Sequence, residues 1–470
     1  MIEVPAAIIG AGPAGLSAAI ELARAGVETL VIDENDRPGG QLVKQIHRFF
    51  GSRHEMAGMR GFEIGEALFS EAERLGVRFM LNTAAYGIFK ESGQLGIHDR
   101  RDDLLGLVKA ERLILATGAR ENPLWFPGWT LPGVMGAGAF QTMVNVHRVM
   151  PGRRIVVVGS GNVGLIVAFQ ALQAGIEVAA VCEALPRLGG WEVHGAKLRR
   201  QGVPILLSTT VERALGDEEV RGVVLVRLDK DGRPEPGERR VLEVDAICLA
   251  VGLSPLAELA WMAGCRCVFS NELGGWLPAH DEWMRTSIET LWVAGDLAGV
   301  EEASTAMEEG RLAGLGVSRS LGALDRRAAV LRGRKIRARL EELREGSCGK
   351  YRKTAKAALV KGGEPGSHRS SLVPGRTDEP AEDEMVCRCE EVPRALIARA
   401  IREGARTVDA VKRRTRAGMG LCQGRTCRGL VSRLITEVSG EPPRNLVPPT
   451  VRPPVRPLPM EGLVKGEDLL

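Results

Sequence analysis

Four cysteines near the C-terminus have the residue type and the spacing of a metal site. Cys387 and Cys389 form a C-x-C pair, and Cys422 and Cys427 form a C-x4-C pair. Thiolates are the ligands that iron–sulfur clusters need, and a two-iron cluster takes four of them. Structural zinc is the alternative, although zinc sites usually pair their cysteines as C-x2-C, a spacing that neither pair has. The pattern favours a [2Fe-2S] cluster and leaves zinc open.

The sequence between the two pairs predicts a small domain that could gather the four thiols. Apolar residues at helical spacing predict a helix over residues 392–401, and a second short helix begins near residue 408. Both cysteine pairs lie in sequence typical of loops. Two helices whose ends present cysteines would bring the four thiols to one site.

A glycine-rich turn near the N-terminus predicts a first dinucleotide site. A strand over residues 6–9 leads into the turn, and a helix over 16–25 follows it. The three glycines of this fingerprint allow a tight turn, a close approach to a pyrophosphate and close packing of helix on strand. The helix N-terminus attracts the phosphates. The next strand ends at the acid expected to bind the ribose, 18 residues after the last glycine. The predicted site residues are Gly10, Gly12, Pro13, Ala14, Gly15, Asp33 and Glu34.

Two further segments resemble the flavin motifs of two-dinucleotide flavoproteins and so indicate FAD. One strand ends at Thr117 and Gly118, and another, over residues 291–294, runs into Gly295 and Asp296. The resemblance implies that Asp296 accepts hydrogen bonds from the ribityl chain. It also implies that the helix beginning near Ala303 points its N-terminus at the flavin ring. Gly40 and Gln41 match the loop that follows the ribose acid in thioredoxin-reductase-like flavoproteins.

A second glycine-rich turn predicts another dinucleotide-binding domain. It lies between a strand over residues 154–158 and a helix over 165–174. The position 18 residues after its last glycine is Cys182, and the acid Glu183 comes one residue later. Three interpretations remain open: Glu183 binds the ribose of NAD(P), the pocket holds another adenine nucleotide, or it is empty. The candidate residues are Gly159, Gly161, Asn162, Gly164 and Glu183.

These motifs predict an α/β fold with two Rossmann-like dinucleotide-binding domains, one inserted in the other, and a small α-helical C-terminal [2Fe-2S] domain. We expect the FAD-binding domain at 1–150 and 254–322, the second Rossmann domain at 151–253, and the cluster domain at 385–438. Residues 323–384 would form a basic helix and a linker, and residues 439–470 a tail. The tail has eight prolines within residues 441–459, which predicts an extended segment docked within the chain or on a partner.

Composition fits an ordinary globular protein of several domains. The chain has 470 residues, 44% of them hydrophobic, and a net charge of only +4. Residues 326–361 hold thirteen Lys or Arg against three Glu, which we interpret as a solvated connector or partner-docking helix and not as a nucleic-acid site. The absence of a long apolar run argues against a membrane span. The N-terminus lacks the features of a secretory signal and nine cysteines suit a reducing compartment, so we expect a cytoplasmic location.

The sequence assigns no catalytic residue. No nucleophile or acid is placed beside His47, His147, His194 or His280. A disulfide reductase is excluded, because it needs a redox-active cysteine pair close to the flavin. The remaining cysteines offer neither C-x2-C nor C-x4-C spacing and are expected to pack or to be incidental: Cys182, Cys248, Cys265, Cys267 and Cys348.

The cysteine segment resembles the bacterioferritin-associated-ferredoxin-like [2Fe-2S] domain. The version in flavin subunits of opine oxidases, hydroxyproline dehydrogenases and hydrogen cyanide synthase is the most similar, especially in the run KRRTRAGMGLCQGRTC. The resemblance covers nearly the whole chain. It implies the flavin and iron–sulfur electron-transfer subunit of a heteromeric dehydrogenase or oxidase. The substrate class would be an amino acid, an imino acid or an opine-like secondary amine, oxidised at its C–N bond.

The same resemblance implies partner subunits. A second flavoprotein subunit would oxidise the substrate, a small ferredoxin-like subunit could complete the complex, and FMN could bind at a subunit interface. Two other functions remain open. The chain could be an NAD(P)H:acceptor oxidoreductase that passes electrons through FAD to the cluster, or a non-enzymatic metal-domain scaffold or redox sensor.

Overall fold

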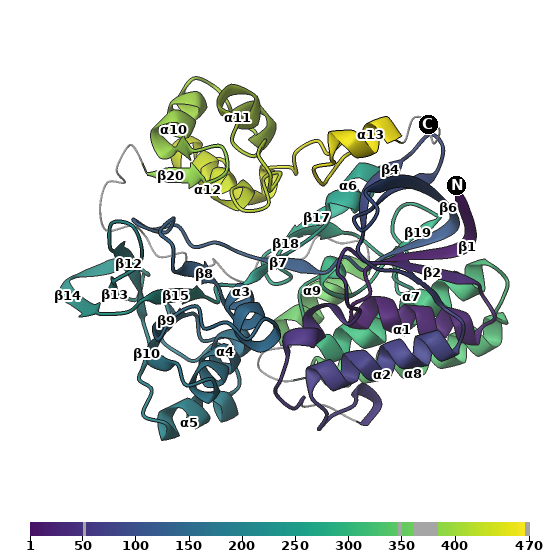
Figure 1. Cartoon of the computed structure of the whole chain (residues 1–470), viewed down its shortest axis with the longest axis horizontal. Helices are drawn as coiled ribbons and strands as arrows, with labels where there is room; N and C mark the ends of the chain where they lie inside the picture. Colours follow the sequence, from purple (N-terminus) through teal and green to yellow (C-terminus); the bar gives the residue numbers. More distant parts are fainter. Residues whose placement is uncertain (50–52, 346–349, 361–383, 466–470) are drawn as a thin grey trace. The chain divides into compact units, whose positions relative to one another are not determined.

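The structure is a computed structural model that describes residues 1–49, 53–345, 350–360 and 384–465. The described residues form two compact units, whose elements are labelled in Figure 1. The first unit comprises the described parts of Met1–Arg120, Ser254–Arg369 and Thr450–Leu470. The second comprises the described parts of Glu121–Leu253 and Ser370–Pro449. Each unit contains its own parallel sheet, as the two glycine motifs predict.

The sheet of the first unit has a buried parallel half and an antiparallel extension. The parallel strands, in spatial order, are β3 (Arg78–Met80), β2 (Thr29–Ile32), β1 (Ile2–Ile9), β6 (Leu104–Leu115) and β19 (Leu291–Val293). The antiparallel strands are β5 (Gln94–Asp99) and β4 (Thr83–Phe89), which extend the sheet from the first half of β6. Ala6, Ala7 and Ile8 of β1 are fully buried, as expected of a strand covered on both faces.

Helices of the first unit pack on this sheet. They are α1 (Pro13–Arg24), α2 (Gly61–Arg74), α7 (Ala303–Ser320), α8 (Arg326–Leu343) and α9 (Lys350–Val360). Glycines let α7 approach α1 closely, because a Cβ at Gly310 would overlap the carbonyl oxygen of Ala14 and one at Gly314 would lie 2.7 Å from the oxygen of Ala18. The smaller elements are the 3-10 turns Gly40–Lys44, Arg53–Glu55 and Gly295–Ala298, helix α6 (Glu258–Ala263) and the hairpin β17 (Cys267–Ser270)–β18 (Gly275–Pro278).

The second unit repeats the dinucleotide-binding pattern on a five-stranded parallel sheet. Its strands, in order, are β11 (Ile205–Leu206), β10 (Glu177–Cys182), β9 (Arg154–Val158), β15 (Ala246–Leu249) and β8 (Val134–Gly136). Its helices are α3 (Ala137–Gln141), which continues as a π-helix over Thr142–Val146, α4 (Asn162–Gln173) and α5 (Glu192–Arg200). An antiparallel sheet follows, made of β12 (Thr209–Leu215), β13 (Gly222–Leu228) and β14 (Pro234–Leu242). Short strands β7 (Ala119–Glu121) and β16 (Leu253–Pro255) pair with each other.

The division of the chain differs from the predicted one at residue 150. Residues 121–150 lie with the second unit, because β8 pairs in parallel with β15 and so extends the second sheet. The sequence offered little warning of this, since β8 has only three residues.

The cysteine domain lies in the second unit and is mostly helical. It consists of the two-stranded β20 (Met385–Cys387) and β21 (Val392–Pro393), then α10 (Arg394–Arg402), α11 (Val408–Thr415) and α12 (Arg428–Ser439). Two tryptophans of the same unit hold it. The Trp129 Nε1–H donates to the carbonyl oxygen of Met385 at 2.8 Å. The Arg388 guanidinium lies 5.2 Å from the centre of the Trp129 ring, and the Arg394 guanidinium lies 5.9 Å from the centre of the Trp125 ring.

The last described segment of the chain lies with the first unit. After a 3-10 turn at Pro443–Asn445, residues 450–465 lie with that unit and end in α13 (Met460–Lys465), which packs on β6. The N–H of Val455 donates to the carbonyl oxygen of Tyr86 at 2.8 Å. Docking within the chain, one of the two expectations for the proline-rich tail, is therefore observed for this part of it.

Two expectations fall on residues that the structure does not describe. Most of the predicted linker, residues 361–383, lies outside the described residues, and so does Cys348. Within the described ranges, the helices are too short or too polar to cross a lipid bilayer.

The close packing of α1 on α7 gives a first prediction. Gly310→Ala should destabilise the chain by about 1–3 kcal/mol, because the added methyl group overlaps the backbone of α1 and must push the helices apart. Thermal unfolding of the variant, followed by circular dichroism, measures this as a lower melting temperature. Gly429→Ala on α12 is the matched control, since a Cβ there meets no atom within 4 Å. Equal melting temperatures for the two variants would contradict the packing.

Candidate functional site

The first glycine turn has the backbone that a pyrophosphate site needs. Gly10 has a φ of +107°, and a Cβ there would overlap the carbonyl oxygen of Ala116. A Cβ at Gly15 would overlap the carbonyl oxygen of Gly10, so the turn closes only with glycine at both positions. The N-cap of α1 is Gly12, which supplies no capping side chain, and Pro13 begins the helix. The first N–H groups of α1 are therefore left for an anion.

Asp33 stands at the end of β2, beside this turn. Its carboxylate accepts hydrogen bonds from the Ala11 N–H at 2.6 Å and from the N–H and Nδ2 of Asn35, both at 2.8 Å. Burial raises the pKa of Asp33, and these three hydrogen bonds oppose that rise. The bonds fix the carboxylate where the fingerprint places a ribose-binding acid.

The loop that follows Asp33 folds back over the same turn. Gly39 donates its N–H to the Ala11 carbonyl oxygen at 2.7 Å, and a Cβ at Gly40 would lie 2.8 Å from the Cα of Gly12. Gly40 begins a 3-10 turn, and Gln41, its second residue, is exposed. The residues predicted from the loop and from the glycine turn therefore come together.

The second flavin motif meets the first at the start of α1. A Cβ at Gly295, which has a φ of +69°, would lie 2.9 Å from the Cβ of Ala14. Thr117 and Gly118 lie at the end of β6, where the Thr117 hydroxyl donates to the Leu256 carbonyl oxygen at 2.7 Å and Gly118 accepts from the Leu256 N–H at 3.0 Å. The structure thus places the three predicted flavin segments in one unit around one turn.

Asp296 lies between β19 and α7, the helix that begins at Ala303. Its carboxylate accepts the Glu301 N–H at 3.2 Å. Burial raises the pKa of Asp296 to about 7, and the nearby carboxylates of Glu309 and Glu302 add to the rise. The N-cap of α7, Glu302, makes no side-chain cap, so this helix also presents free N–H groups at its start.

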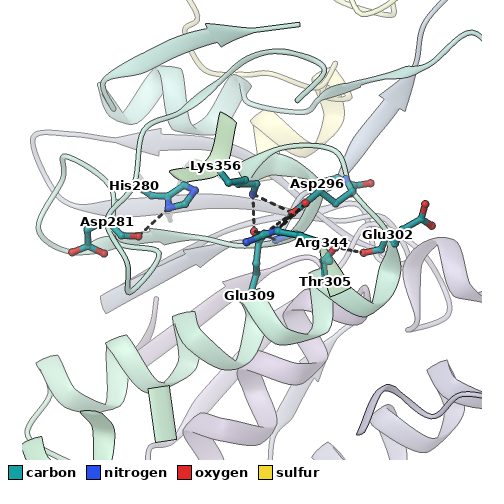
Figure 2. A network of polar contacts seen from close by, with 10 residues as sticks. His280, Asp281, Asp296, Glu302, Thr305, Glu309, Arg344 and Lys356 are labelled. Carbon is teal, nitrogen blue, oxygen red and sulfur yellow. Dashed lines mark hydrogen bonds and ion pairs between the residues drawn. The ribbon is translucent and has the colours of Figure 1, made fainter. Parts of the chain in front are cut away.

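A buried ion cluster supports this turn (Figure 2). Glu309 of α7 accepts the Gly295 N–H at 3.1 Å with one carboxylate oxygen. Its other oxygen accepts from Lys356 at 2.6 Å and from Arg344 at 2.7 Å. Arg344 also contacts Glu301 at 2.5 Å. The four side chains are between 3% and 13% exposed, so each charge depends on its partner.

Lys356 and Arg344 were missed as site residues. They come from the basic stretch 326–361, which the sequence led us to interpret as a solvated connector or docking helix. The interpretation is wrong for these two residues, because α8 and α9 bring them back to the buried start of α7. The signal in the sequence was the apolar residues of this basic run, such as Leu340 before Arg344 and Ala355 and Leu359 beside Lys356, which are buried.

His280 closes the far side of the ion cluster. Its Nδ1 contacts the Asp281 carbonyl oxygen at 3.0 Å (Figure 2), whereas its buried Nε2 has no hydrogen-bond partner among the described residues. Burial lowers the pKa of His280 to about 4, with Lys356 as the next cause, so the ring is neutral near pH 7. The cradle of glycines and the two placed acids, Asp33 and Asp296, together fit a flavin dinucleotide in the first unit.

The second glycine turn repeats the first. A Cβ at Gly159 would overlap the carbonyl oxygen of Ala250, and one at Gly164 would overlap that of Gly159. Gly161 is the N-cap of α4, which begins at Asn162. The Asn162 side chain accepts the Trp191 N–H at 2.9 Å, so the loop after β10 folds over this turn as well.

Glu183 takes the place in the second unit that Asp33 has in the first. Its carboxylate accepts from the N–H of Ser160 at 2.9 Å and from its hydroxyl at 2.7 Å, just as Asp33 accepts from the residue after Gly10. Cys182 is where the residue count expected the acid. β10 has a bulge between Val178 and Ala180, and the extra residue moves the acid one position along the chain.

The four predicted cluster cysteines gather at one point of the cysteine domain. The Sγ atoms of Cys387 and Cys389 are 4.0 Å apart, and those of Cys389 and Cys422 are 3.7 Å apart. A tetrahedral metal ion with metal–sulfur bonds of about 2.3 Å holds two thiolates about 3.8 Å apart. The hydrogen bond with Cys427 lowers the pKa of Cys387, and the N–H groups of Gly418 and Glu390 lower it further, against the effect of burial. The donor set fits a thiolate-bound metal centre.

The loop around these thiols needs its glycines. Gly418 and Gly424 have φ angles of +90° and +77°, and a Cβ at Gly420 would lie 2.7 Å from the Sγ of Cys389. Cys387 and Cys427 are buried, whereas Cys389 is exposed, so the site has an inner and an outer side. The other described cysteines pack as expected: burial raises the pKa of Cys182 and Cys267 to about 12.

Comparison with known families identifies the two parts of the chain. The family described as "Pyridine nucleotide-disulphide oxidoreductase" matches residues 5–310, and the family described as "BFD-like [2Fe-2S] binding domain" matches residues 385–437. Hydrogen cyanide synthase subunit HcnB of Pseudomonas aeruginosa is 31% identical over 97% of both chains. One opine oxidase subunit from Agrobacterium tumefaciens is 29% identical over 96% of this chain and 89% of its own.

The chain belongs to the flavin and iron–sulfur subunits of the hydrogen cyanide synthase and opine oxidase type. It is an FAD-dependent oxidoreductase that carries a BFD-like [2Fe-2S] domain, so the predicted family, enzyme class and iron–sulfur domain are confirmed.

Solved structures confirm the predicted fold of this subunit type. L-proline dehydrogenase from P. horikoshii has a TM-score of 0.71 at 24% identity and covers 98% of this chain and 79% of its own. T. acidophilum thioredoxin reductase has a TM-score of 0.56 at 22% identity and covers 68% of this chain and all of its own.

The thiol geometry gives a second prediction. Cys387→Ser should lower the iron content from about two atoms per chain to near zero, because a two-iron cluster needs four thiolates. Iron analysis and the visible absorbance beyond the flavin bands measure the loss. Cys265→Ser is the control, since this buried thiol lies outside the cysteine domain and its Sγ is 3.6 Å from the Thr286 hydroxyl, which a serine can also reach. A Cys387→Ser chain that keeps both irons would refute the ligand assignment.

The ion cluster gives a third prediction. Lys356→Met should destabilise the first unit by about 3 kcal/mol and lower its FAD content, because Glu309 loses one of its two buried cations and no longer holds the Gly295 N–H firmly. Melting temperature and flavin content after gel filtration measure both effects. Lys353→Met on the same helix is the control, since its side chain is 40% exposed and pairs at 3.8 Å with an exposed Glu345. Unchanged flavin content in Lys356→Met would contradict a role for the cluster at this turn.

Proposed function

We propose that the chain is the electron-transfer subunit of a heteromeric dehydrogenase or oxidase that oxidises the C–N bond of an amino acid, an imino acid or an opine-like secondary amine. The observation that carries the proposal is the presence, in one chain, of a flavin-type dinucleotide cradle and a separate four-thiol site. The names of its relatives, hydrogen cyanide synthase, opine oxidase and sarcosine oxidase, support the substrate class.

FAD exchanges two electrons as hydride, whereas a [2Fe-2S] cluster carries one electron at a time, so a chain that binds both can link the two kinds of transfer. The residues of the chain bind and orient. The first turn of α1 would hold the pyrophosphate, Asp33 the adenosine ribose and Asp296 the ribityl chain. Cys387, Cys389, Cys422 and Cys427 would ligate the cluster, with the N–H groups of Gly418 and Glu390 favouring the thiolate form of Cys387.

A partner subunit would hold the amine. Between the two flavin segments of the described chain, residues 121–253 are taken up by the second parallel sheet and its antiparallel neighbour. These described residues therefore include no separate domain that would enclose an amine substrate. We infer a second flavoprotein subunit as the site of C–N oxidation, with a small ferredoxin-like subunit as a further partner and FMN at an interface between subunits.

The second nucleotide site supports an alternative function as an NAD(P)H:acceptor oxidoreductase. The observation in its favour is Glu183, which is fixed by Ser160 in the place of a ribose acid. A carboxylate there binds an unmodified ribose and repels a 2′-phosphate, so the site suits NAD or another adenine nucleotide better than NADP. Nucleotide binding at Glu183 is compatible with both functions, whereas hydride entry there is required only by the alternative.

A fourth prediction separates these functions. In an anaerobic cuvette, the isolated chain with FAD and iron in place should keep its flavin absorbance when proline, N-methylglycine or an opine is added, because the amine site lies on a partner. NADH should leave the flavin oxidised as well, whereas dithionite should reduce it fully. Bleaching by an amine would place the substrate site in this chain and refute the proposed division of labour. Rapid bleaching by NADH would establish the alternative.

A further inference from the structure

From here on, the tail means residues 450–465, the described part of the predicted tail 439–470 that lies with the first unit. It follows the cysteine domain, which lies in the other unit, and then packs against β4, β6 and the loop after β2. Its proline-rich composition stands out in the sequence, and the proposed function gives it no task.

Three contacts hold the tail. The Val455 N–H donates to the Tyr86 carbonyl oxygen of β4 at 2.8 Å, and the Val455 side chain is only 6% exposed. Pro453 lies over Gly87, where a Cβ would be 2.9 Å from the Cβ of the proline. Arg456 contacts the Glu34 carboxylate at 2.6 Å. The first contact is backbone pairing, the second is packing and the third is an ion pair, so the tail is held by three independent kinds of interaction.

The Arg456–Glu34 ion pair lies next to the predicted ribose-binding acid. Glu34 directly follows Asp33, which accepts the Ala11 N–H of the first glycine turn and is the acid proposed above to hold the adenosine ribose. Its carboxylate is shared by two arginines, Arg456 and Arg100, the latter at 3.2 Å. Arg100 comes from the turn after β5, so the loop behind Asp33 is held from the sheet on one side and from the tail on the other.

We propose that the tail is a latch on the adenosine end of the FAD site. The Arg456–Glu34 pair fixes the loop that carries Asp33, and this raises the affinity of the first site for FAD without a direct contact to the flavin. Arg456 is therefore a positioning residue. Because coupling between two binding events is reciprocal, bound FAD must stabilise the docked tail by the same factor.

The proposal rests on FAD binding to the first unit and is tested by binding, not by turnover. FAD is removed from the full-length chain and titrated back while flavin fluorescence is followed. Arg456→Ala should weaken FAD binding about threefold to fivefold, the range expected of an ion pair that is partly exposed. Gly87→Ala should act in the same direction, because its methyl group pushes Pro453 away without touching a residue of the nucleotide site. Arg452→Ala, an exposed arginine of the same tail, is the matched control and should bind FAD like the parent chain.

Hydrogen exchange at the Val455 amide supplies the reciprocal measurement. If the tail had only a structural role, FAD would not change this exchange rate. FAD should slow this exchange about threefold to fivefold in the parent chain and not in Arg456→Ala. Two outcomes overturn the latch while leaving the proposed function in place: FAD affinities within twofold of the parent in both Arg456→Ala and Gly87→Ala, or Val455 exchange that is equal with and without FAD. A parent chain that binds no FAD would overturn the latch and the proposed function together.

Discussion

The close approach of α7 to α1 is the contact on which the first nucleotide site depends. Gly310 and Gly314 let the two helices touch backbone to backbone, and Gly295 lets the turn before α7 rest on Ala14 at the start of α1. Two helix N-termini, each without a side-chain cap, are thereby brought to one place. Glu309, held by Lys356 and Arg344, accepts the Gly295 N–H, so a buried charge network contacts the turn directly.

The two units share one arrangement around their glycine turns. In both, a glycine with positive φ follows the first strand, and an acid at the end of the second strand accepts the N–H of the residue after that glycine. In both, a loop with two glycines folds over the turn. The second unit differs by one bulged residue in β10 and by the cysteine domain that packs on Trp125 and Trp129. A chain with two dinucleotide-type sites and one thiol site suits the joining of two-electron to one-electron transfer.

Sequence reasoning succeeded where a local pattern fixes the geometry. The glycine turns, the acid Asp33 and the cysteine pairs each specify their own backbone, and the structure gathers them as expected. It failed where distant segments meet. Lys356 lies in a basic run, and only the fold shows that it contacts Glu309 of α7. Arg456 lies among prolines, and only the fold shows that it contacts Glu34, 422 positions earlier in the chain. The expected spacing placed the second acid at Cys182, one residue before Glu183. A bulge in β10 adds this residue, and the sequence carries no signal for the bulge.

The central claim is that one chain carries a flavin and a thiolate-bound two-iron cluster. An anaerobic titration of the isolated full-length chain with dithionite, followed by absorbance and electron paramagnetic resonance, tests it most directly. Two electrons for FAD and one for a [2Fe-2S] cluster predict about three reducing equivalents per chain, together with a paramagnetic signal from the reduced cluster. An end point at about two equivalents without that signal, with zinc instead of iron in the protein, would contradict the claim and leave the cysteine domain as a structural module.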